Sequence, residues 1–271
     1  MFPQLRFFLG LLACIPLLPV LIIQGKRVRQ SIPRLPEAGG ARVGSIGEGS
    51  GAIRLLTLGE STIAGVGVAD HQEGITGQIA TSLHELSGKK IHWEVIAKSG
   101  YTARRVTELL VPHIPERRID LIVIGLGGND TFHLNTPRRW VRDFSDLLHA
   151  LRNRQPSCPI IIADLPPVAE FPAFPRLMRM ILGGLLHLHH LAIRKLPANF
   201  NSVCYMDTPI RLENWGKLLP EGKSPADFFS DGVHPSPLTY SIWGKQIARF
   251  AIQHSLVEGF EPQRENMKEH A

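Results

Sequence analysis

The sequence has few cysteines. Cys14, Cys158 and Cys204 are the three thiols in a chain of 271 residues. A disulfide framework needs several cysteines at close spacing, and a structural zinc site needs cysteines and histidines grouped along the chain. The sequence therefore excludes both. We interpret the cysteines as buried thiols, and we expect a protein without a metal or a cofactor.

The body of the chain also lacks a surplus of positive charge. The chain has 30 Lys and Arg against 24 Asp and Glu, but residues 1–51 hold six of the basic residues and two of the acidic ones. The remainder is nearly neutral. Because phosphate backbones are bound by clustered cations, we exclude nucleic acid as a partner.

Three motifs of other protein classes are absent. Residues 59–63 read Gly-Glu-Ser-Thr-Ile, which lacks the last glycine of the G-x-S-x-G nucleophile elbow. Gly59 is not followed by the lysine of a phosphate-binding P-loop, and Gly65 and Gly67 do not extend to G-x-G-x-x-G. His187 and His190 in "HLHH" have no carboxylate within several residues. We interpret that stretch as a solvated helix face and not as a metal site.

A long hydrophobic run lies near the amino terminus. The 19 residues from Phe7 to Gly25 carry no charge, and crossing a bilayer takes about 20 apolar residues. We predict that residues 1–30 hold a membrane segment and its basic flank, with residues 7–23 in the membrane. The alternatives are a cleaved signal peptide and a lipoprotein signal at Cys14, but no small-residue cleavage pattern follows.

The charges that flank this run slightly favour one side of the membrane. The amino terminus and Arg6 precede the run, whereas four basic residues between positions 26 and 34 follow it. Positive charge tends to stay in the cytoplasm, so the body is expected on the cytoplasmic side. A periplasmic protein, or one secreted after signal cleavage, is the alternative.

The remaining chain divides by composition. Residues 31–51 are rich in Pro, Gly and Ser and lack periodic apolar positions, which predicts a flexible linker. Residues 258–271 are expected to form a polar, disordered tail. Residues 52–257 are left as one folded domain.

Within that domain, short apolar runs alternate with segments of helical period. The expected strands are residues 53–58, 91–97, 120–126, 159–164 and 202–207. The expected helices are residues 75–86, 102–111, 137–154, 174–196 and 237–255. This alternation predicts an α/β fold with a parallel sheet covered by helices on both faces. In such a sheet, binding and chemistry gather beyond the carboxyl ends of the strands.

Residues that suit acyl transfer follow those strand ends. Ser61 follows the first expected strand, and a serine becomes a nucleophile when a histidine oriented by a carboxylate removes its proton. Asp231 and His234 lie three positions apart, which places them on the same side of a helix-like turn. The backbone N–H groups of Ser61 and Gly100 and the side-chain amide of Asn129 are candidate donors to an oxyanion.

Four short blocks carry a family resemblance. "LGESTIAG", "SGYTA", "GGND" and "DGVH", in this order, resemble the sequence blocks of the SGNH hydrolases, also called the GDSL esterase and lipase family. The resemblance covers about residues 53–252. It implies a flavodoxin-like αβα sandwich with five parallel strands, preceded here by the amino-terminal hydrophobic helix.

The resemblance also implies roles for single residues. Ser61 is then the nucleophile and His234 the base that Asp231 orients. Ser61, Gly100 and Asn129 then form the oxyanion hole.

Glu60 departs from the family pattern, which has aspartate before the serine. The longer side chain cannot make the same short bonds to nearby backbone groups, and we interpret it as a tolerated variation of the turn; an inactivated site is the alternative. Asp130 is expected to be structural and to accept bonds from backbone donors behind the site.

The expected helix at 174–196 carries a broad apolar stripe. Its members are Phe174, Leu177, Met178, Ile181, Leu182, Leu185, Leu186 and Leu188. Gly183 and Gly184 interrupt it, at a cost of about 1 kcal/mol each relative to alanine. One hypothesis is that the helix packs on the sheet. The other is that part of the stripe lines an acyl pocket or touches lipid.

These observations predict a membrane-tethered serine esterase that hydrolyses carboxylic esters through an acyl-serine intermediate. The preferred substrates are lipid or lysophospholipid acyl esters. One alternative is an acyl or acetyl transferase that acts on a surface glycan. Another is a catalytically silent ligand-binding domain of the same fold.

Overall fold

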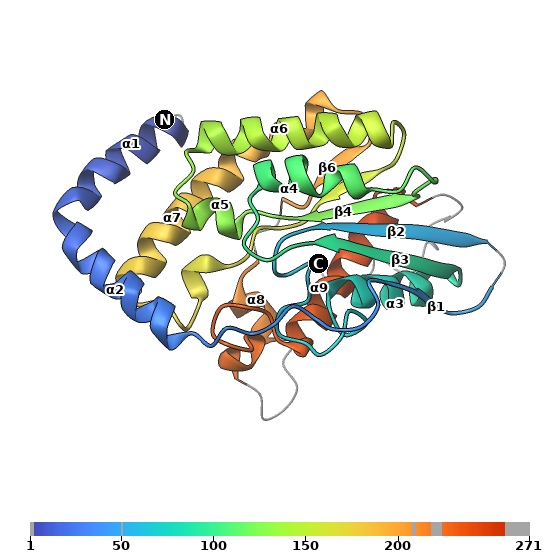
Figure 1. Ribbon diagram of the computed structural model, residues 1–271, viewed down its shortest axis with the longest axis horizontal. Helices are drawn as coiled ribbons and strands as arrows, with labels where there is room; N and C mark the ends of the chain where they lie inside the picture. The colour runs from blue at the N-terminus through green and yellow to red at the C-terminus, as the bar shows by residue number, and fades with distance from the viewer. Residues whose placement is uncertain (1–2, 50, 208–209, 218–223, 258–271) are drawn as a thin grey trace, which may run out of the picture.

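The sheet of the computed structural model has six strands in the order β1-β3-β2-β4-β5-β6 (Figure 1). The structure describes residues 3–49, 51–207, 210–217 and 224–257, so the predicted tail at 258–271 lies outside the described residues. The strands are β1 (Val43–Ile46), β2 (Ala52–Gly59), β3 (Lys90–Ala97), β4 (Leu121–Gly125), β5 (Ile160–Ile162) and β6 (Val203–Tyr205).

The five strands from β2 to β6 are the predicted ones, and they are parallel. The order β3-β2-β4-β5-β6 is the flavodoxin-like one, in which the first parallel strand lies between the second and the third. The predicted five-stranded parallel sheet is therefore confirmed. Strand β1 was not predicted, and it pairs antiparallel with β3 at the sheet edge.

Strand β1 and the residues before it overturn the expectation of a flexible linker at 31–51. The Glu37 carboxylate binds the Arg42 guanidinium at 2.9 Å and accepts the N–H of Ser99 at 2.8 Å. The Ala38 N–H donates to the carbonyl of Ala64 at 3.0 Å. Without β1, the backbone of β3 would be an open sheet edge, and this pairing closes it.

Nine α-helices are described, together with five short 3₁₀ helices. The α-helices are α1 (Pro3–Cys14), α2 (Leu18–Ser31), α3 (Ile75–Ser87), α4 (Ala103–Leu109), α5 (Gly128–Phe132), α6 (Pro137–Arg154), α7 (Arg176–Ile193), α8 (Leu212–Gly216) and α9 (Pro237–Gln253). The 3₁₀ helices are η1 (Ile15–Leu17), η2 (Val111–His113), η3 (Val168–Glu170), η4 (Pro197–Asn199) and η5 (Pro225–Phe228).

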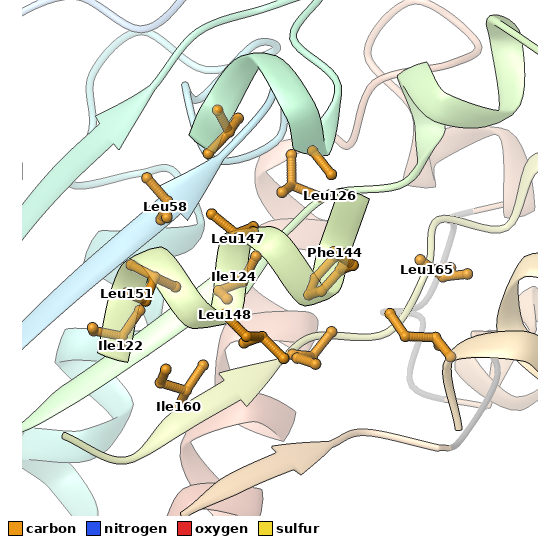
Figure 2. Close-up of a cluster of buried hydrophobic side chains, with 14 of the residues drawn as sticks. Leu58, Ile122, Ile124, Leu126, Phe144, Leu147, Leu148, Leu151, Ile160 and Leu165 are labelled. Carbon is orange, nitrogen blue, oxygen red and sulfur yellow. The ribbon is translucent and has the colours of Figure 1, made fainter. Parts of the chain in front are cut away.

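Two hydrophobic cores lie on the two faces of the sheet. Alternate strand residues point to opposite faces, so Leu58 and Ile124 belong to one core and Leu55 and Val123 to the other. Helices α4, α6 and α7 cover the first face, and α3 and α9 cover the second. In Figure 2, the α6 side chains Phe144, Leu147, Leu148 and Leu151 point toward strand residues of the first core. Cys158 belongs to this core, whereas Cys14 and Cys204 are half-buried.

Helix α9 starts immediately after the Asp231–His234 segment. Ser236 is its N-cap, and its hydroxyl accepts the N–H of Thr239 at 3.4 Å, while Pro237 occupies the first turn. Buried α9 residues such as Tyr240 and Trp243 then fix the helix in the second core. The cap and this packing hold the segment with His234 at the end of the sheet.

The amino-terminal helices α1 and α2 curve along one side of the molecule (Figure 1). The stretch Pro3–Ser31 is long and apolar enough to cross a membrane, and no side chain of its most apolar part is buried. A signal sequence has the same properties. Helix α1 contacts α6 and α7, and the Arg138 N–H donates to Gln4 at 3.1 Å.

The carboxyl half of α7 packs on the sheet, as one of the two hypotheses predicted. Leu186 and Ile193 are buried in the first core, whereas Met180 in the amino half is 66% exposed. A β-carbon on Gly183 would lie 2.6 Å from the β-carbon of Ala169 in η3. Gly183 therefore lets α7 approach η3 closely, which explains a glycine that is unfavourable in a helix.

The interpretation of "HLHH" as a solvated helix face is wrong for two of its histidines. His189 is fully buried, stacks on Trp140 and bonds the carbonyl of Asn135 at 2.7 Å. His190 is half-buried and bonds the Tyr205 hydroxyl at 2.7 Å. Their partners come from distant segments, so spacing along the chain could not reveal them.

Candidate active site

Three of the predicted site residues line one cavity at the carboxyl end of the sheet. Ser61, Asn129 and His234 border this cavity of about 210 Å³, which we call the first cavity. Ser61 follows β2, Asn129 lies in α5 directly after β4, and His234 lies before α9. Segments more than 170 residues apart in sequence, at positions 61 and 234, therefore meet at one place.

His234 is held by Asp231 in the arrangement that their spacing predicts. The Asp231 Oδ2 lies 2.7 Å from the His234 Nδ1, and Oδ1 accepts the backbone N–H groups of Val233 and His234 at 2.9 and 2.7 Å. The Asp231 side chain is fully buried, whereas that of His234 is 26% exposed. Burial acts to raise the pKa of the Asp231 carboxyl, but the hydrogen bonds from His234 and Val233 outweigh it, so this pKa lies below its usual value.

Gly100 lies in the loop after β3, and it is not among the described residues that line the first cavity. It is exposed, and no described atom would lie within 4 Å of an added β-carbon. Its φ of +81° is the feature that requires glycine. Its role as an oxyanion donor stays a prediction.

Glu60 binds the turn after the neighbouring strand, a function that the sequence pattern did not indicate. Its carboxylate accepts the backbone N–H of Gly128 at 2.8 Å, the backbone N–H of Asn129 at 2.9 Å and the Asn129 side-chain amide. These partners were not expected from the sequence, and the tolerance of glutamate at this position stays a prediction. The available signal was the "GGND" turn, whose free N–H groups at the start of a helix need acceptors.

The Asn129 amide donates to two acceptors of the protein. Besides Glu60, its Nδ2 donates to the carbonyl of Tyr101 at 3.2 Å. Both protons of the amide thus have a partner within the protein. A substrate oxyanion at this position would compete with these acceptors.

Burial raises the pKa of the Glu60 carboxyl to about 7, and the nearby charge of Asp130 acts in the same direction. The hydrogen bonds from Asn129 and Gly128 oppose the shift. Asp130 is itself fully buried and accepts the Ala103 N–H at 2.9 Å and the Asn135 side chain at 2.7 Å. The prediction that Asp130 accepts backbone donors is confirmed.

The wall of the first cavity is largely apolar and rich in aromatic rings. Its aromatic members are Phe132, Phe171, Trp215, Phe228, Phe229 and Trp243. None of the described lining residues belongs to α7, so the hypothesis that the α7 stripe lines an acyl pocket is wrong for this cavity. No group of three His, Cys, Asp or Glu residues in the described part of the chain is placed to hold a metal ion.

Comparison with known proteins gives a consistent family. The model of the GDSL-like Lipase/Acylhydrolase family matches residues 57–242. The GDSL-like esterase Rv1075c of Mycobacterium tuberculosis (strain ATCC 25618 / H37Rv) is 26% identical over 214 residues, which cover 76% of this chain. The match spans 63% of the length of that relative.

Solved structures show the same fold at low sequence identity. TesA has a TM-score of 0.55 and 18% identity, over 75% of this chain and 99% of its own. The lipase Lip_vut3 from a goat rumen metagenome has a TM-score of 0.56 and 17% identity, over 73% and 96% of the two chains. A structure described as a GDSL-like lipase from Parabacteroides merdae ATCC 43184 has a TM-score of 0.56 and 18% identity, over 73% of this chain and 95% of its own.

Proposed function

This chain belongs to the GDSL-like lipase/acylhydrolase family, and on that premise we propose that it is a serine esterase that hydrolyses carboxylic esters through an acyl-serine intermediate. The observation that carries the proposal is the first cavity. Ser61, Asn129 and His234 line it together, and the imidazole of His234 is held by a buried carboxylate.

In the proposed reaction, the Ser61 Oγ attacks the ester carbonyl carbon while His234 removes its proton. Asp231 holds the Nδ1 side of the imidazole and stabilises the imidazolium. The tetrahedral intermediate collapses, the C–O bond to the alcohol breaks, and His234 returns the proton to the departing alcohol. A water molecule, activated by the same imidazole, then cleaves the acyl-serine.

The oxyanion of each tetrahedral intermediate needs hydrogen-bond donors. We assign this role to the N–H groups of Ser61 and Gly100 and to the side-chain amide of Asn129. Each such donor contributes about 3 kcal/mol to transition-state stabilisation. Glu60 and the carbonyl of Tyr101 accept both protons of the Asn129 amide, so this amide serves an oxyanion by sharing a proton with one of these two acceptors.

The wall of the first cavity supports an acyl chain as the group bound there. Its wall is largely apolar and includes six Phe and Trp side chains, and at about 210 Å³ it is smaller than a typical pocket for a whole drug-sized ligand. The cavity therefore suits a single acyl chain. We propose lipid or lysophospholipid acyl esters as the substrate class.

We further propose that residues 7–23 anchor the protein in a membrane. The apolar stretch Pro3–Ser31, with no buried side chain in its most apolar part, supports this assignment. The flanking charges slightly favour a cytoplasmic domain. Alkaline carbonate should leave the full chain in the membrane fraction and release a chain that starts at residue 30; release of both would contradict the anchor.

The test of the esterase uses a fluorophosphonate, which reacts with activated serines whatever ester the enzyme hydrolyses. The full chain in detergent should gain one adduct in its intact mass, and Ser61→Ala and His234→Ala should gain none. Ser99→Ala is the matched control, because Ser99 follows the neighbouring strand β3 and is also half-buried. It should label like the wild type. A folded wild type without an adduct would overturn the proposal.

Hydrolysis and acyl transfer share the acyl-serine and differ in the acceptor. Once an ester substrate is found, the ratio of free acid to transfer product in the presence of added alcohols separates the two. Predominant transfer would replace hydrolysis by the transferase alternative.

A further inference from the structure

A second cavity, of about 270 Å³, lies beside the first at the carboxyl ends of β5 and β6. Its polar lining includes Asp164, Tyr205 and His190. Pro166, Pro167 and Ile210 line both cavities, so one wall separates them.

The two cavities are close enough for one substrate. The pairing register places Leu58 beside Ile124, and Ile124 beside Ile162. Glu60 lies two residues after Leu58, and Asp164 lies two residues after Ile162. Strand β4 lies between the two strands that these residues follow. At about 4.8 Å between neighbouring strands, their backbones are about 10 Å apart.

Asp164 is the unusual group in the second cavity. The residue is 6% exposed, and its buried Oδ1 has no hydrogen-bond partner among the described residues. A buried carboxyl oxygen without a partner is unfavourable for folding. A ligand that hydrogen-bonds to the Asp164 Oδ1 would explain why this buried oxygen has no partner within the described part of the protein.

The other carboxylates of this region have partners. Asp207 binds the Arg194 guanidinium at 2.6 Å and the His190 Nε2 at 3.1 Å. Glu170 accepts the backbone N–H of Leu212 at 2.9 Å. The contrast separates Asp164 from side chains that only stabilise the fold.

The chemistry at Asp164 favours a neutral hydroxyl ligand. Burial raises the pKa of the Asp164 carboxyl to about 8; the bond from its own backbone N–H opposes the rise and the charge of Asp207 adds to it, so the neutral form of the carboxyl is favoured. A neutral carboxyl both donates and accepts, as a hydroxyl group does. Tyr205, whose hydroxyl bonds the His190 Nδ1 at 2.7 Å, belongs to the same lining. An ammonium ligand would instead require an ionised Asp164.

We propose that the second cavity binds the alcohol part of the substrate, a hydroxyl-bearing group such as a glycerol unit, through Asp164 and Tyr205. This inference rests on the proposed esterase function and deepens it. The first cavity takes the acyl chain, and the second takes the polyhydroxylated alcohol to which that chain is esterified.

The test measures binding without catalysis. The probes are 1-O-butylglycerol, which has two hydroxyl groups, and butyl methyl ether, which has none; both are ethers and cannot be hydrolysed. Isothermal titration of the full chain in detergent should give an affinity for the diol at least about tenfold higher. Asp164→Ala should abolish this preference and leave the affinity for butyl methyl ether unchanged. Asp164→Asn, which keeps a donor and an acceptor, should retain most of it.

Two further measurements keep the test decisive. Tyr205→Phe removes a hydroxyl without changing the ring and should lower the diol preference several-fold even if Asp164→Ala fails to fold. The melting temperature of Asp164→Ala should be equal to or above that of the wild type, since an unpartnered buried carboxyl oxygen is removed. An unchanged diol preference in Asp164→Ala would overturn the inference, whatever the melting temperature of this variant.

Failure of this inference is distinguishable from failure of the esterase proposal. A fluorophosphonate adduct on a wild type with no diol preference overturns the alcohol-binding cavity alone. A diol preference without an adduct upholds the cavity and overturns the esterase.

Discussion

Glu60 and Asp164 are two buried carboxyls at the same edge of the sheet, and they differ in their partners. Glu60 accepts bonds from two backbone N–H groups and one side-chain amide, whereas the buried Oδ1 of Asp164 has no partner among the described residues. Burial raises the pKa of both, to about 7 and about 8. The Glu60 carboxylate thus has its hydrogen-bond partners within the protein, whereas the Asp164 carboxyl still has an oxygen without one in the part of the chain that the structure describes.

The largest expected effect is on catalysis, and it separates the two carboxyls. Glu60→Ala leaves the turn of Gly128 and Asn129 without the acceptor that positions its backbone, and a misplaced oxyanion donor costs about 100-fold or more in kcat. The rate of hydrolysis of ethyl butyrate, an ester without hydroxyl groups, measures this effect. Asp164→Ala should change that rate by less than about threefold, because the alcohol part of this ester has no group for Asp164 to bind.

Glu85→Ala on the exposed face of α3 is the control for this comparison and should have no effect. Glu60→Asp, which restores the residue usual in the family, should retain more activity than Glu60→Ala. Equal losses in Glu60→Ala and Asp164→Ala would remove the distinction between the two carboxyls.

The second effect is on stability, and its sign should differ between the two sites. Glu60→Ala leaves the N–H groups of Gly128 and Asn129 without their acceptor, which should lower the free energy of unfolding by about 2 kcal/mol or more. Asp164→Ala should raise it slightly or leave it unchanged. Thermal unfolding of both variants in detergent measures the two shifts, and a destabilised Asp164→Ala would mean that Asp164 has a structural partner.

The third effect is on the pH dependence of stability. A carboxyl whose pKa is raised on folding stabilises the folded state fully below its unfolded pKa, and this contribution is lost as the pH rises through the folded pKa. For Asp164, this contribution to stability is lost between about pH 4 and about pH 8. Asp164→Asn should therefore gain stability relative to the wild type as the pH rises from 5 to 8, by more than about 1 kcal/mol.

Glu60→Gln gives the matched pH series. The pH range over which Glu60 loses this contribution is narrower and ends at about 7, so the stability of Glu60→Gln relative to the wild type should stop changing about one pH unit earlier. Melting temperatures at half-unit pH steps follow both variants. Parallel curves for Asp164→Asn and the wild type would contradict a raised pKa at Asp164.

The smallest effect concerns the contact beside the second cavity. Gly183→Ala gains about 1 kcal/mol of helix propensity, but its methyl group would overlap Ala169, and overpacking costs about 1 to 3 kcal/mol. The net loss of stability should be about 1 kcal/mol. Gly184→Ala is the control, because no described atom lies within 4 Å of its added β-carbon, and it should be stabilised.

The strands and long helices could be predicted because their patterns are local. Residues 137–154 were expected as a helix, and α6 has the same bounds, since a capping threonine and a proline mark its start. Strand β1 could not be predicted in the same way. Its four residues lie among glycines, and the open edge of β3, which is distant in sequence, determines its conformation.

The site also contains contacts that follow from local spacing and contacts that depend on the fold. Asp231 and His234 are three residues apart, so their contact follows from spacing. The partners of Glu60 and the aromatic wall from Phe132 to Trp243 come from segments that only the folded sheet brings together. No local pattern marks such residues, because their role depends on tertiary neighbours.

The ordered chain between α2 and β1 shortens the connection between the amino-terminal helices and the domain. The segment that was expected to be a flexible linker is attached to the domain at Glu37, whose carboxylate binds Arg42 and Ser99. Only five residues, 32–36, lie between the end of α2 and this attachment. Fully extended, they span at most about 17 Å. With residues 7–23 in a bilayer, as proposed, this short connection limits how far the domain can lie from the membrane surface. The proposed esterase would then meet its substrates in the plane of the membrane.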